Sequence, residues 1–299
     1  MNVGEWVQDR AKIWLEAKKF LKDFHNEAIV VKIGGRVISN EQMLNNFLED
    51  VVLLNLFGMR IVVVHGGGPE ISDEMRKMGV KPKFIEGLRV TDEKTMEILH
   101  EQLAGKISSQ IVQGISRLGG IAHSMSGMDS NFIRARKMIY KTTTSKGKEI
   151  EIDLGLVGEV EKVDPTIINK IIKESIPVIA PIGIDSEGRS LNINADMAAA
   201  EIAVAMHAKK LVIVTDVMGV MRDPNDEKTL ISTMTAADVQ ALMQEGIIKK
   251  GMVPKMDACL KALNLGVERC HIINGNIPHV LLLEILTEAG IGTMIERGK

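Results

Sequence analysis

Two lysines, one aspartate and two glycine clusters are the residues of this sequence best suited to chemistry. Lys32 lies in an apolar run that ends at Gly34 and Gly35, and a second cluster, Gly66–Gly68, follows another apolar run after His65. Consecutive glycines let backbone N–H groups approach an anion closely, and a helix beginning behind them adds a favourable dipole. Two such loops at neighbouring strand ends predict a site that holds a polyphosphate, or a phosphoryl group in transfer, from several sides.

Neither cluster matches a standard nucleotide fingerprint. The sequence has no GxxxxGK[ST] pattern, and Ile71 stands where the dinucleotide-binding pattern requires Gly or Ala. A glycine cluster alone is more often a tight turn than a nucleotide site. The presence of two clusters after successive predicted strands therefore carries the argument for phosphate binding.

Lys32 and Lys255 each allow two interpretations. Lysine is unfavourable inside an apolar run such as 29–33 unless it is paired, so Lys32 is either an edge-strand lysine that reaches solvent or a cation placed on phosphoryl oxygens. Lys255 follows Gly251 at the start of a predicted helix, where a cation opposes the helix dipole. It is either a surface lysine or a second phosphate clamp.

The segment 191–196 combines two amides and a carboxylate. Asn192 and Asn194 alternate with Ile193, so both can face one side of an extended segment, and Asp196 falls at the start of an Ala-rich helix. Turn chemistry would explain the asparagines and helix capping would explain Asp196. Together they also suit substrate binding by amides beside a carboxylate that orients lysines.

Two further residues are candidates for ligand contacts. Arg89 is either a bidentate clamp for a substrate carboxylate or a member of a surface ion pair. Asp216 follows a predicted strand and either shapes a nucleotide pocket or caps its own loop. The sequence shows no GxSxG, HExxH or EF-hand pattern, and its seven histidines have no ligand spacing, so no protein-held metal is expected. This inventory suits direct in-line phosphoryl transfer that relies on positioning and electrostatics.

The elements that must position these residues alternate between strands and helices. Continuous β-branched runs predict buried parallel strands, and apolar residues at helical spacing predict helices on both faces. The predicted strands are 28–33, 60–64, 177–180, 211–215, 269–273 and 292–295. The predicted helices are 41–57, one beginning at Pro69, one long or two short helices in 92–118, and 195–207, 235–245, 254–265 and 278–287. Stretches 131–143 and 149–160, joined by a polar turn at 145–148, predict a β-hairpin at the edge of the main sheet.

An amphipathic helix precedes the first strand. Trp14, Phe20 and Phe24 lie on its apolar stripe, opposite Lys and Glu residues. The helix either packs on its own domain or reaches a neighbouring subunit. No linker divides the rest of the chain, so we expect one continuous α/β domain, a three-layer α/β/α sandwich with a mainly parallel central sheet. Its segments are residues 1–26, the helix, and two lobes at 27–184 and 185–299.

Composition excludes several classes of protein. The 299 residues carry a formal charge of −2, which argues against binding nucleic acid or anionic membranes through bulk electrostatics. Two cysteines cannot form a disulfide framework, and no apolar run approaches the ~20 residues of a membrane span. Charged residues throughout 1–24 exclude a secretory signal, so the expected location is the cytoplasm.

The motifs together resemble acetylglutamate kinases, a branch of the amino acid kinase family. The resemblance runs from about 28 to 297, with the motifs in family order. They are KIGG at 32–35, HGGGP at 65–69, GLRVT at 87–91, NINAD at 192–196, TDV at 215–217 and GMVPK at 251–255. The resemblance implies ATP-dependent phosphorylation of the γ-carboxylate of N-acetyl-L-glutamate, the second step of arginine synthesis. It places the amino acid in the N-terminal lobe and ATP in the C-terminal lobe.

The resemblance also implies roles for single residues. Lys32 and Lys255 would stabilise the transferring phosphoryl group, Asp196 would organise both lysines, and Mg²⁺ would enter with ATP, bound chiefly through phosphates. The N–H groups implied to hold the phosphoryl oxygens belong to Gly34, Gly35, Gly66 and Gly67. The implied substrate-binding residues are Gly66, Gly67, Gly68, Arg89, Asn192 and Asn194. The implied nucleotide-binding residues are Lys32, Asp216 and Lys255.

Regulation is implied by the ends of the chain. Arginine-inhibited members carry an N-terminal helix that interlaces dimers into a hexameric ring, and they share a C-terminal segment like residues 270–275 and 283–293 of this chain. His271 and Glu284 are the candidates for a pocket that binds L-arginine, because a carboxylate suits a guanidinium. The expected assembly is a homo-oligomer, a dimer or a hexamer. No feature decides whether a PII-type regulator binds.

Two stretches depart from the family pattern and leave alternatives open. Arg36-Val37-Ile38 stands where the family usually has a small residue and then Ala-Met, and 124–129 lacks a usual lysine at Met128. These changes touch the substrate rim. A kinase for another N-acylated amino acid, such as N-acetyl-aminoadipate, is the first alternative, because one methylene changes binding by only ~1–3 kcal/mol. A catalytically silent arginine sensor is the second, and the intact Lys32, Lys255 and Asp196 argue against it.

Overall fold

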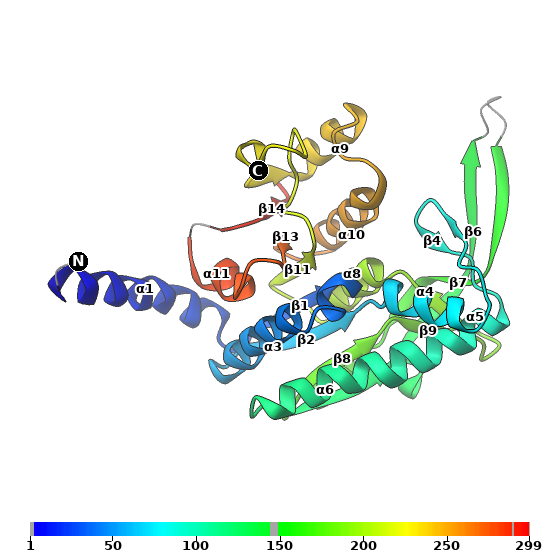
Figure 1. The fold of residues 1–299 in the computed structure, drawn as a ribbon, viewed down its shortest axis with the longest axis horizontal. Helices are drawn as coiled ribbons and strands as arrows, with labels where there is room; N and C mark the ends of the chain where they lie inside the picture. The colour runs from blue at the N-terminus through cyan, green and yellow to red at the C-terminus, as the bar shows by residue number, and fades with distance from the viewer. Residues whose placement is uncertain (1–2, 144–148, 289, 299) are drawn as a thin grey trace.

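The computed structural model of the protein describes residues 3–143, 149–288 and 290–298. Within these residues an eight-stranded sheet runs through the molecule (Figure 1). Its strands, in spatial order, are β12 (Thr233–Thr235), β14 (Thr293–Glu296), β13 (Arg269–Asn274), β11 (Lys210–Thr215), β1 (Ala28–Ile33), β2 (Arg60–His65), β8 (Ile176–Ala180) and β5 (Ala122–Ser126). All pairs are parallel except β13 with β14, which confirms the mainly parallel sheet.

Helices cover both faces of this sheet. On one face lie α2 (Gly35–Ile38), α3 (Glu41–Leu56), α4 (Gly68–Lys77), α5 (Glu93–Leu99), the π-helix η1 (His100–Ile107), α6 (Ser108–Arg117) and α11 (Val280–Leu286). On the other lie α7 (Thr166–Ile171), α8 (Ala195–Ala205), α9 (Ala236–Gln244) and α10 (Val253–Asn264). Short 3₁₀ turns are η2 (Asp129–Asn131), η3 (Glu227–Thr229) and η4 (Lys250–Met252). The three-layer α/β/α architecture is confirmed.

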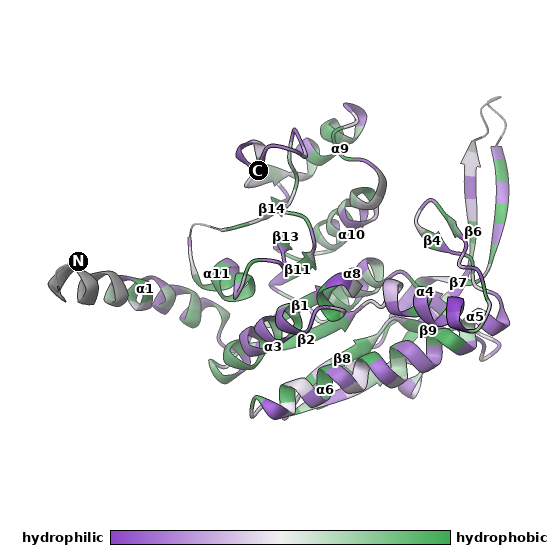
Figure 2. Ribbon diagram, in the orientation of Figure 1, coloured by the Kyte–Doolittle hydropathy of each residue, from purple (hydrophilic) through white to green (hydrophobic). Residues whose placement is uncertain are grey.

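The two hydrophobic cores follow from the side-chain alternation of the central strands. Ile29 and Val31 of β1 pack with α3 and α6, whereas Val30 packs with α8 and α10. Both faces must then be apolar, which explains the continuous β-branched runs. Figure 2 shows the central strands β1, β2 and β8 as hydrophobic, with polar residues on the outward sides of α3 and α6.

The predicted hairpin forms, but its predicted place is wrong. Strands β6 (Ile133–Thr143) and β7 (Glu149–Val163) join β9 (Ile182–Ile184) and β10 (Ser190–Ile193) in a small closed sheet, and β5 occupies the edge of the main sheet instead. The pairing of two adjacent strands joined by a short turn can be predicted from the local sequence. Strands β9 and β10 are too short for an alternation of apolar and polar residues to be recognised. The turn predicted at 145–148 lies outside the described residues. A further two-stranded ribbon, β3 (Phe84–Ile85) with β4 (Leu88–Arg89), precedes α5.

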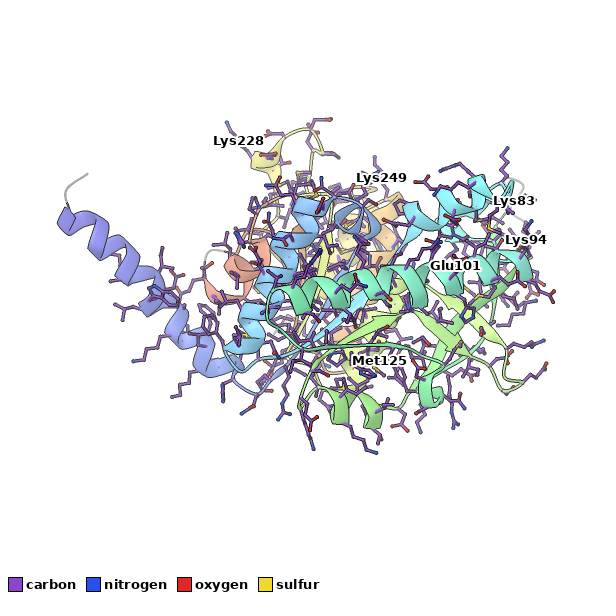
Figure 3. The ribbon with its side chains drawn as sticks, turned by 60° about the horizontal axis from the view of Figure 1, so that its bottom comes forward. Lys83, Lys94, Glu101, Met125, Lys228 and Lys249 are labelled. Carbon is purple, nitrogen blue, oxygen red and sulfur yellow. The ribbon has the colours of Figure 1, made fainter. Side chains whose placement is uncertain are left out.

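Helix α1 (Val3–Phe24) projects from the molecule (Figures 1 and 3). Ala17 is buried, and Phe20, Leu21 and Phe24 pack on the core of the same chain. Ile13, Trp14 and Leu15 are instead 60 to 69% exposed. The C-terminal part of the helix thus packs on its own domain, while apolar residues of its middle face solvent.

Candidate active site

One carboxylate joins the two lysines. Asp196 lies in the first turn of α8, with Oδ1 2.7 Å from Lys32 Nζ and Oδ2 3.0 Å from Lys255 Nζ. Lys32 belongs to β1, which lies between β11 and β2, so the edge-strand alternative for this lysine is wrong. Lys255 begins α10 with its side chain 17% exposed, so it is not a surface lysine. A carboxylate between two ammonium groups gives a compact cluster of net charge +1.

Burial and charge act in opposite directions within this cluster. Burial alone would raise the pKa of Asp196, but the charges and hydrogen bonds of Lys32 and Lys255 outweigh it and lower this pKa to about 2. Burial lowers the pKa of Lys32, while Asp196 opposes that shift. Asp196 is therefore ionised throughout the physiological range and stabilises the charged state of the buried lysine.

The two glycine loops pack directly against each other at this end of the sheet. A Cβ on Gly35 would lie 2.4 Å from Pro69 Cδ, and a Cβ on Gly67 would lie 2.4 Å from Ile107 Cδ1. Real Cβ atoms do not approach other atoms this closely. The rigid proline ring leaves no room for a Cβ on Gly35, whereas a Cβ on Gly67 would require the side-chain ends of Ile107 and Leu103 to move. Gly34 and Gly67 precede the first turns of α2 and α4, where the N–H groups have no intrahelical partner. The loops can therefore offer backbone donors to an anion beside the lysines.

One implied donor is already in use. The N–H of Gly66 donates to the carbonyl of Ile33 at 2.9 Å, which ties the second loop to the end of β1. The prediction that this N–H holds a phosphoryl oxygen stays a prediction, and it requires the bond to Ile33 to be shared or exchanged when a ligand binds. Gly66 lines the cavity, and its hydrogen bond to Ile33 helps to set the shape of the loop.

The implied substrate residues come together at one wall of the same cavity. Arg89 is 7% exposed, and its Nη2 donates to the Gly68 carbonyl at 2.9 Å and to Ser72 Oγ at 2.8 Å. Its guanidinium stacks 4.6 Å from the Phe84 ring centroid. Burial, followed by the charge of Arg76, lowers the pKa of Arg89 to about 10, so it stays cationic at neutral pH. Arg89 is buried and forms no ion pair with any residue that the structure describes, which makes the surface ion-pair alternative wrong.

The asparagines separate into two roles. Asn192 on β10 lines the cavity, and its Nδ2 donates to Thr91 Oγ1 at 3.2 Å. Asn194 is the N-cap of α8, because its Oδ1 accepts from the N–H groups of Asp196 and Met197. Asn194, and not Asp196, therefore caps the helix, which leaves the Asp196 carboxylate available to the lysines. Asn194 also lines the cavity.

A cavity of about 430 Å³ unites these residues. It is lined by both glycine loops, the Lys32–Asp196–Lys255 cluster, Arg89 and Asn192, which is a volume and lining typical of a small-molecule site. A neighbouring cavity of about 400 Å³ shares Thr215, Asp216 and Lys255 with it and extends along 217–221 and 247–252. Asp216 also forms an ion pair with Arg36 of α2, the short helix that follows Gly34. The two cavities thus meet beside the lysines.

The fold and these residues match known proteins. The model of the amino acid kinase family matches residues 27–274. The chain belongs to the amino acid kinase family. Its relatives include the acetylglutamate kinases of Methanococcus vannielii, 49% identical over 96% of this chain and 97% of that protein, and of Archaeoglobus fulgidus, 47% identical over 96% and 99%.

Solved structures of other proteins share this fold. The N-acetylglutamate synthase from Neisseria gonorrhoeae complexed with coenzyme A and N-acetyl-glutamate superposes with a TM-score of 0.82 at 27% identity, covering 97% of this chain. The chain spans 64% of the length of that synthase chain. The carbamate kinase from Giardia lamblia bound to AMP-PNP, at 13% identity and a TM-score of 0.63, shares the fold.

A further cavity shares no lining residue with the candidate active site and contains a buried pair of titratable side chains. His271 on β13 and Glu284 on α11 are both buried, with Nδ1 2.5 Å from Oε1. Burial lowers the pKa of His271, and the pKa of Glu284 is also lowered because His271 and the N–H groups of Ile291 and Gly292 outweigh its burial. They line a cavity of about 430 Å³ together with Lys19 and Phe20 of α1.

Sequence reasoning missed two features of the site. The 65–69 motif assigns no separate role to His65, yet this residue is fully buried and hydrogen-bonded to the second glycine loop. The π-helix η1 packs on Gly67, although the residues before Ser108 show only ordinary helical spacing. A buried histidine directly after an apolar strand was the available signal for the first, whereas the second had none.

In residues 3–143, 149–288 and 290–298, no three or more His, Cys, Asp or Glu side chains are grouped so that they could hold a metal ion. No helix in the same ranges is long and apolar enough to cross a bilayer.

Proposed function

We propose that this protein transfers the γ-phosphoryl group of ATP to the γ-carboxylate of N-acetyl-L-glutamate, the second step of arginine synthesis. The Lys32–Asp196–Lys255 cluster at the meeting point of two cavities is the observation that carries this proposal. A substrate carboxylate is already ionised at neutral pH, so the reaction needs no general base. It needs cations and donors around the transferring group, which this site supplies.

The transfer step assigns one task to each part of the site. A carboxylate oxygen attacks the γ-phosphorus as the bond to the β,γ-bridging oxygen breaks, and ADP departs with that electron pair. Lys32 and Lys255 neutralise charge on the phosphoryl oxygens and the leaving oxygen, and Asp196 holds both ammonium groups in position. The N–H groups at Gly34, Gly35 and Gly67 act as further donors.

Arg89 and Asn192 bind the amino-acid substrate in this proposal. Both line the cavity, and both are held by N-terminal-lobe residues, Arg89 by Gly68 and Ser72 and Asn192 by Thr91. A cationic guanidinium whose Nη2 is already anchored presents its remaining donors in a defined direction to a carboxylate. This supports an amino-acid site in the lobe formed by 27–184, with Gly66, Gly67 and Gly68 forming its floor.

The nucleotide occupies the neighbouring cavity in the lobe formed by 185–299. Its shared residues Thr215, Asp216 and Lys255 would lie at the phosphate end, which puts the γ-phosphate beside the lysines. Asp196 is held by two lysines and is unsuited to metal binding. Mg²⁺ would accordingly be held chiefly by the phosphates, where it neutralises their charge. The cytoplasm, which supplies ATP, is the proposed location.

A hydroxylamine trap tests the function. Acyl phosphates react with hydroxylamine to give hydroxamates, so the protein is incubated with Mg-ATP and N-acetyl-L-glutamate, N-acetyl-aminoadipate, glutamate or aspartate in separate reactions. Hydroxamate with acetylglutamate alone is the expected result. Product only with N-acetyl-aminoadipate would favour the first alternative substrate, and no product from folded protein would favour a silent sensor.

We further propose that L-arginine binds the cavity at His271 and Glu284. Glu284 and Glu288 offer carboxylates to a guanidinium, and Lys19, Lys210 and Arg269 offer cations to an α-carboxylate, all lining one cavity. Burial lowers the pKa of Lys210 to about 8. The charge of Glu284 opposes this shift, and the charge of Arg269 adds to it. A zwitterion with a cationic side chain complements this mixture of charges.

The position of α1 connects this cavity with assembly. Lys19 of α1 lies 3.4 Å from Glu288, and the N–H of Glu288 donates to Glu16 at 2.7 Å, so the helix forms one wall of the cavity. The exposed Ile13, Trp14 and Leu15 on the same helix would be covered by the corresponding helix of a second copy. We therefore propose dimers joined through α1 into a hexamer, with the arginine cavity beside this joining helix.

A further inference from the structure

His65 is a fully buried histidine that the transfer step does not use. It is the last residue of β2 and directly precedes Gly66 and Gly67. Its Nδ1 lies 3.1 Å from the carbonyl oxygen of Gly66, and its Nε2 lies 2.8 Å from Ser108 Oγ. Both ring nitrogens therefore have one partner each, one in the glycine loop and the other at the start of α6.

The chemistry of these partners determines where the ring proton lies. Burial lowers the pKa of His65 to about 4, so the imidazole is neutral and carries one N–H. The Gly66 carbonyl can only accept, so Nδ1 must be the nitrogen that donates. Nε2 then accepts from the Ser108 hydroxyl. The Nδ1–H form of His65 is the tautomer that satisfies both partners.

The hydrogen bond from His65 to the Gly66 carbonyl also determines the direction of the Gly67 N–H. The peptide between Gly66 and Gly67 is planar and trans, so its C=O and N–H point in opposite directions. Two glycines in sequence have little intrinsic resistance to rotation of that plane. The N–H of Gly66 is held by Ile33, and the carbonyl of Gly66 is held by His65. Together these bonds hold the N–H of Gly67 in one orientation.

The π-helix η1 positions Ser108, the second hydrogen-bond partner of the His65 ring. An i→i+5 segment adds a residue to a helical turn and so rotates everything after it by about 100° relative to an unbroken α-helix. Ser108 directly follows η1, and Leu103 and Ile107 within it contact the position where Gly67 would carry a Cβ. The same irregularity thus brings Ser108 to the imidazole and packs an apolar wall against the loop.

We propose that His65 is a positioning residue for phosphoryl transfer: with Ser108 it orients the Gly66–Gly67 peptide so that the Gly67 N–H donates to the transferring group. This role rests on the proposed function, because it assigns a direction to one of the donors of that site. A donor aimed in advance needs no reorganisation during the reaction, which is the source of its effect on the transition state.

Three variants of the full-length protein test the positioning role of His65 by steady-state kinetics. His65→Leu removes both hydrogen bonds, and the expected result is a kcat about 10- to 100-fold lower with the KM for ATP within about 3-fold. His65→Asn keeps a donor near the Nδ1 position and should recover most of that loss. Ile111→Val, a buried change one turn along α6 from Ser108, is the matched control for destabilisation and should leave kcat unchanged.

The tautomer is a second readout that is independent of activity. ¹⁵N-histidine NMR on the wild-type protein should show a neutral ring protonated at Nδ1, and Ser108→Ala should broaden or shift the Nε2 signal. A proton on Nε2 would overturn the proposal, as would a His65→Leu enzyme that matches Ile111→Val in kcat. Wild-type protein that forms no hydroxamate would instead refute the proposed function itself, so the two failures are distinguishable.

Discussion

Replacing Asp196 by Asn gives the sharpest test of the charge cluster. Asn keeps the shape of the side chain but removes the charge that lies between Lys32 and Lys255. Lys255 lies in the first turn of α10 with its side chain 17% exposed, so its ammonium group can still reach water. Lys32 is 6% exposed inside the central sheet and cannot. The substitution should therefore leave the buried charge of Lys32 without a compensating carboxylate.

The size of the effect can be estimated in two ways. The pKa of Asp196 falls from 3.8 to about 2, and ~1.4 kcal/mol per pKa unit makes this about 2 kcal/mol of stability at neutral pH. Removing one partner of a buried ion pair typically costs ~3–5 kcal/mol, because the other charge is left uncompensated. Asp196→Asn should lower the free energy of unfolding by an amount in this span, about 2–5 kcal/mol at about pH 6.

The loss of unfolding free energy caused by Asp196→Asn should become smaller as the pH rises. Without Asp196, burial lowers the pKa of Lys32 further below 10.5, so the folded variant releases the proton that the unfolded chain still binds. The unfolded state then binds more protons between that lowered pKa and 10.5, and the free energy of unfolding rises with pH in this window. In the wild type the contribution of Asp196 is complete above 3.8 and is lost as the pH falls through about 2.

Urea denaturation followed by far-UV circular dichroism at about pH 6 and about pH 9 measures both effects. Circular dichroism is preferred because both tryptophans, Trp6 and Trp14, lie in the projecting α1. Lys32→Met combined with Asp196→Asn is the control, since it removes the stranded charge and should regain most of the lost stability. A single Asp196→Asn variant as stable as wild type at both pH values, or a double variant no better than the single one, would refute the reasoning.

Three further predictions follow from the assigned roles. Lys255→Ala should lower kcat about 100- to 1,000-fold while changing the KM for acetylglutamate little, and a change confined to KM would remove Lys255 from the transfer step. Arg89→Ala should raise the KM for acetylglutamate about 10- to 100-fold in steady-state assays, whereas an unchanged KM would contradict its role as a carboxylate clamp. Deleting residues 1–24 should leave hydroxamate formation but abolish hexamers on a sizing column and inhibition by arginine; a hexameric truncated protein would show that α1 only packs on its own chain.

Much of the site was predictable from residue types and order. Lys32 beside Gly34-Gly35 and the 65–69 and 192–196 motifs indicated phosphoryl transfer because lysines, backbone donors and a carboxylate are what that chemistry requires. The central strands were predictable because burial on both faces demands continuous β-branched runs. Strand β5, of sequence AHSMS, was not, because three of its five residues are polar and an edge strand has only one side paired.

The sequence by itself determined the parallel sheet, the helices on its faces and the candidate residues for the chemistry, because these depend on local periodicity and on side-chain types. Only the tertiary structure decided that Asn194 caps α8 while Asp196 joins both lysines, and that the Gly66 N–H is already bonded to Ile33. It also decided the partners of His65 and the place of the β6–β7 hairpin. Each of these depends on contacts between segments distant in sequence, whose geometry is set only when the sheet and its helices pack together.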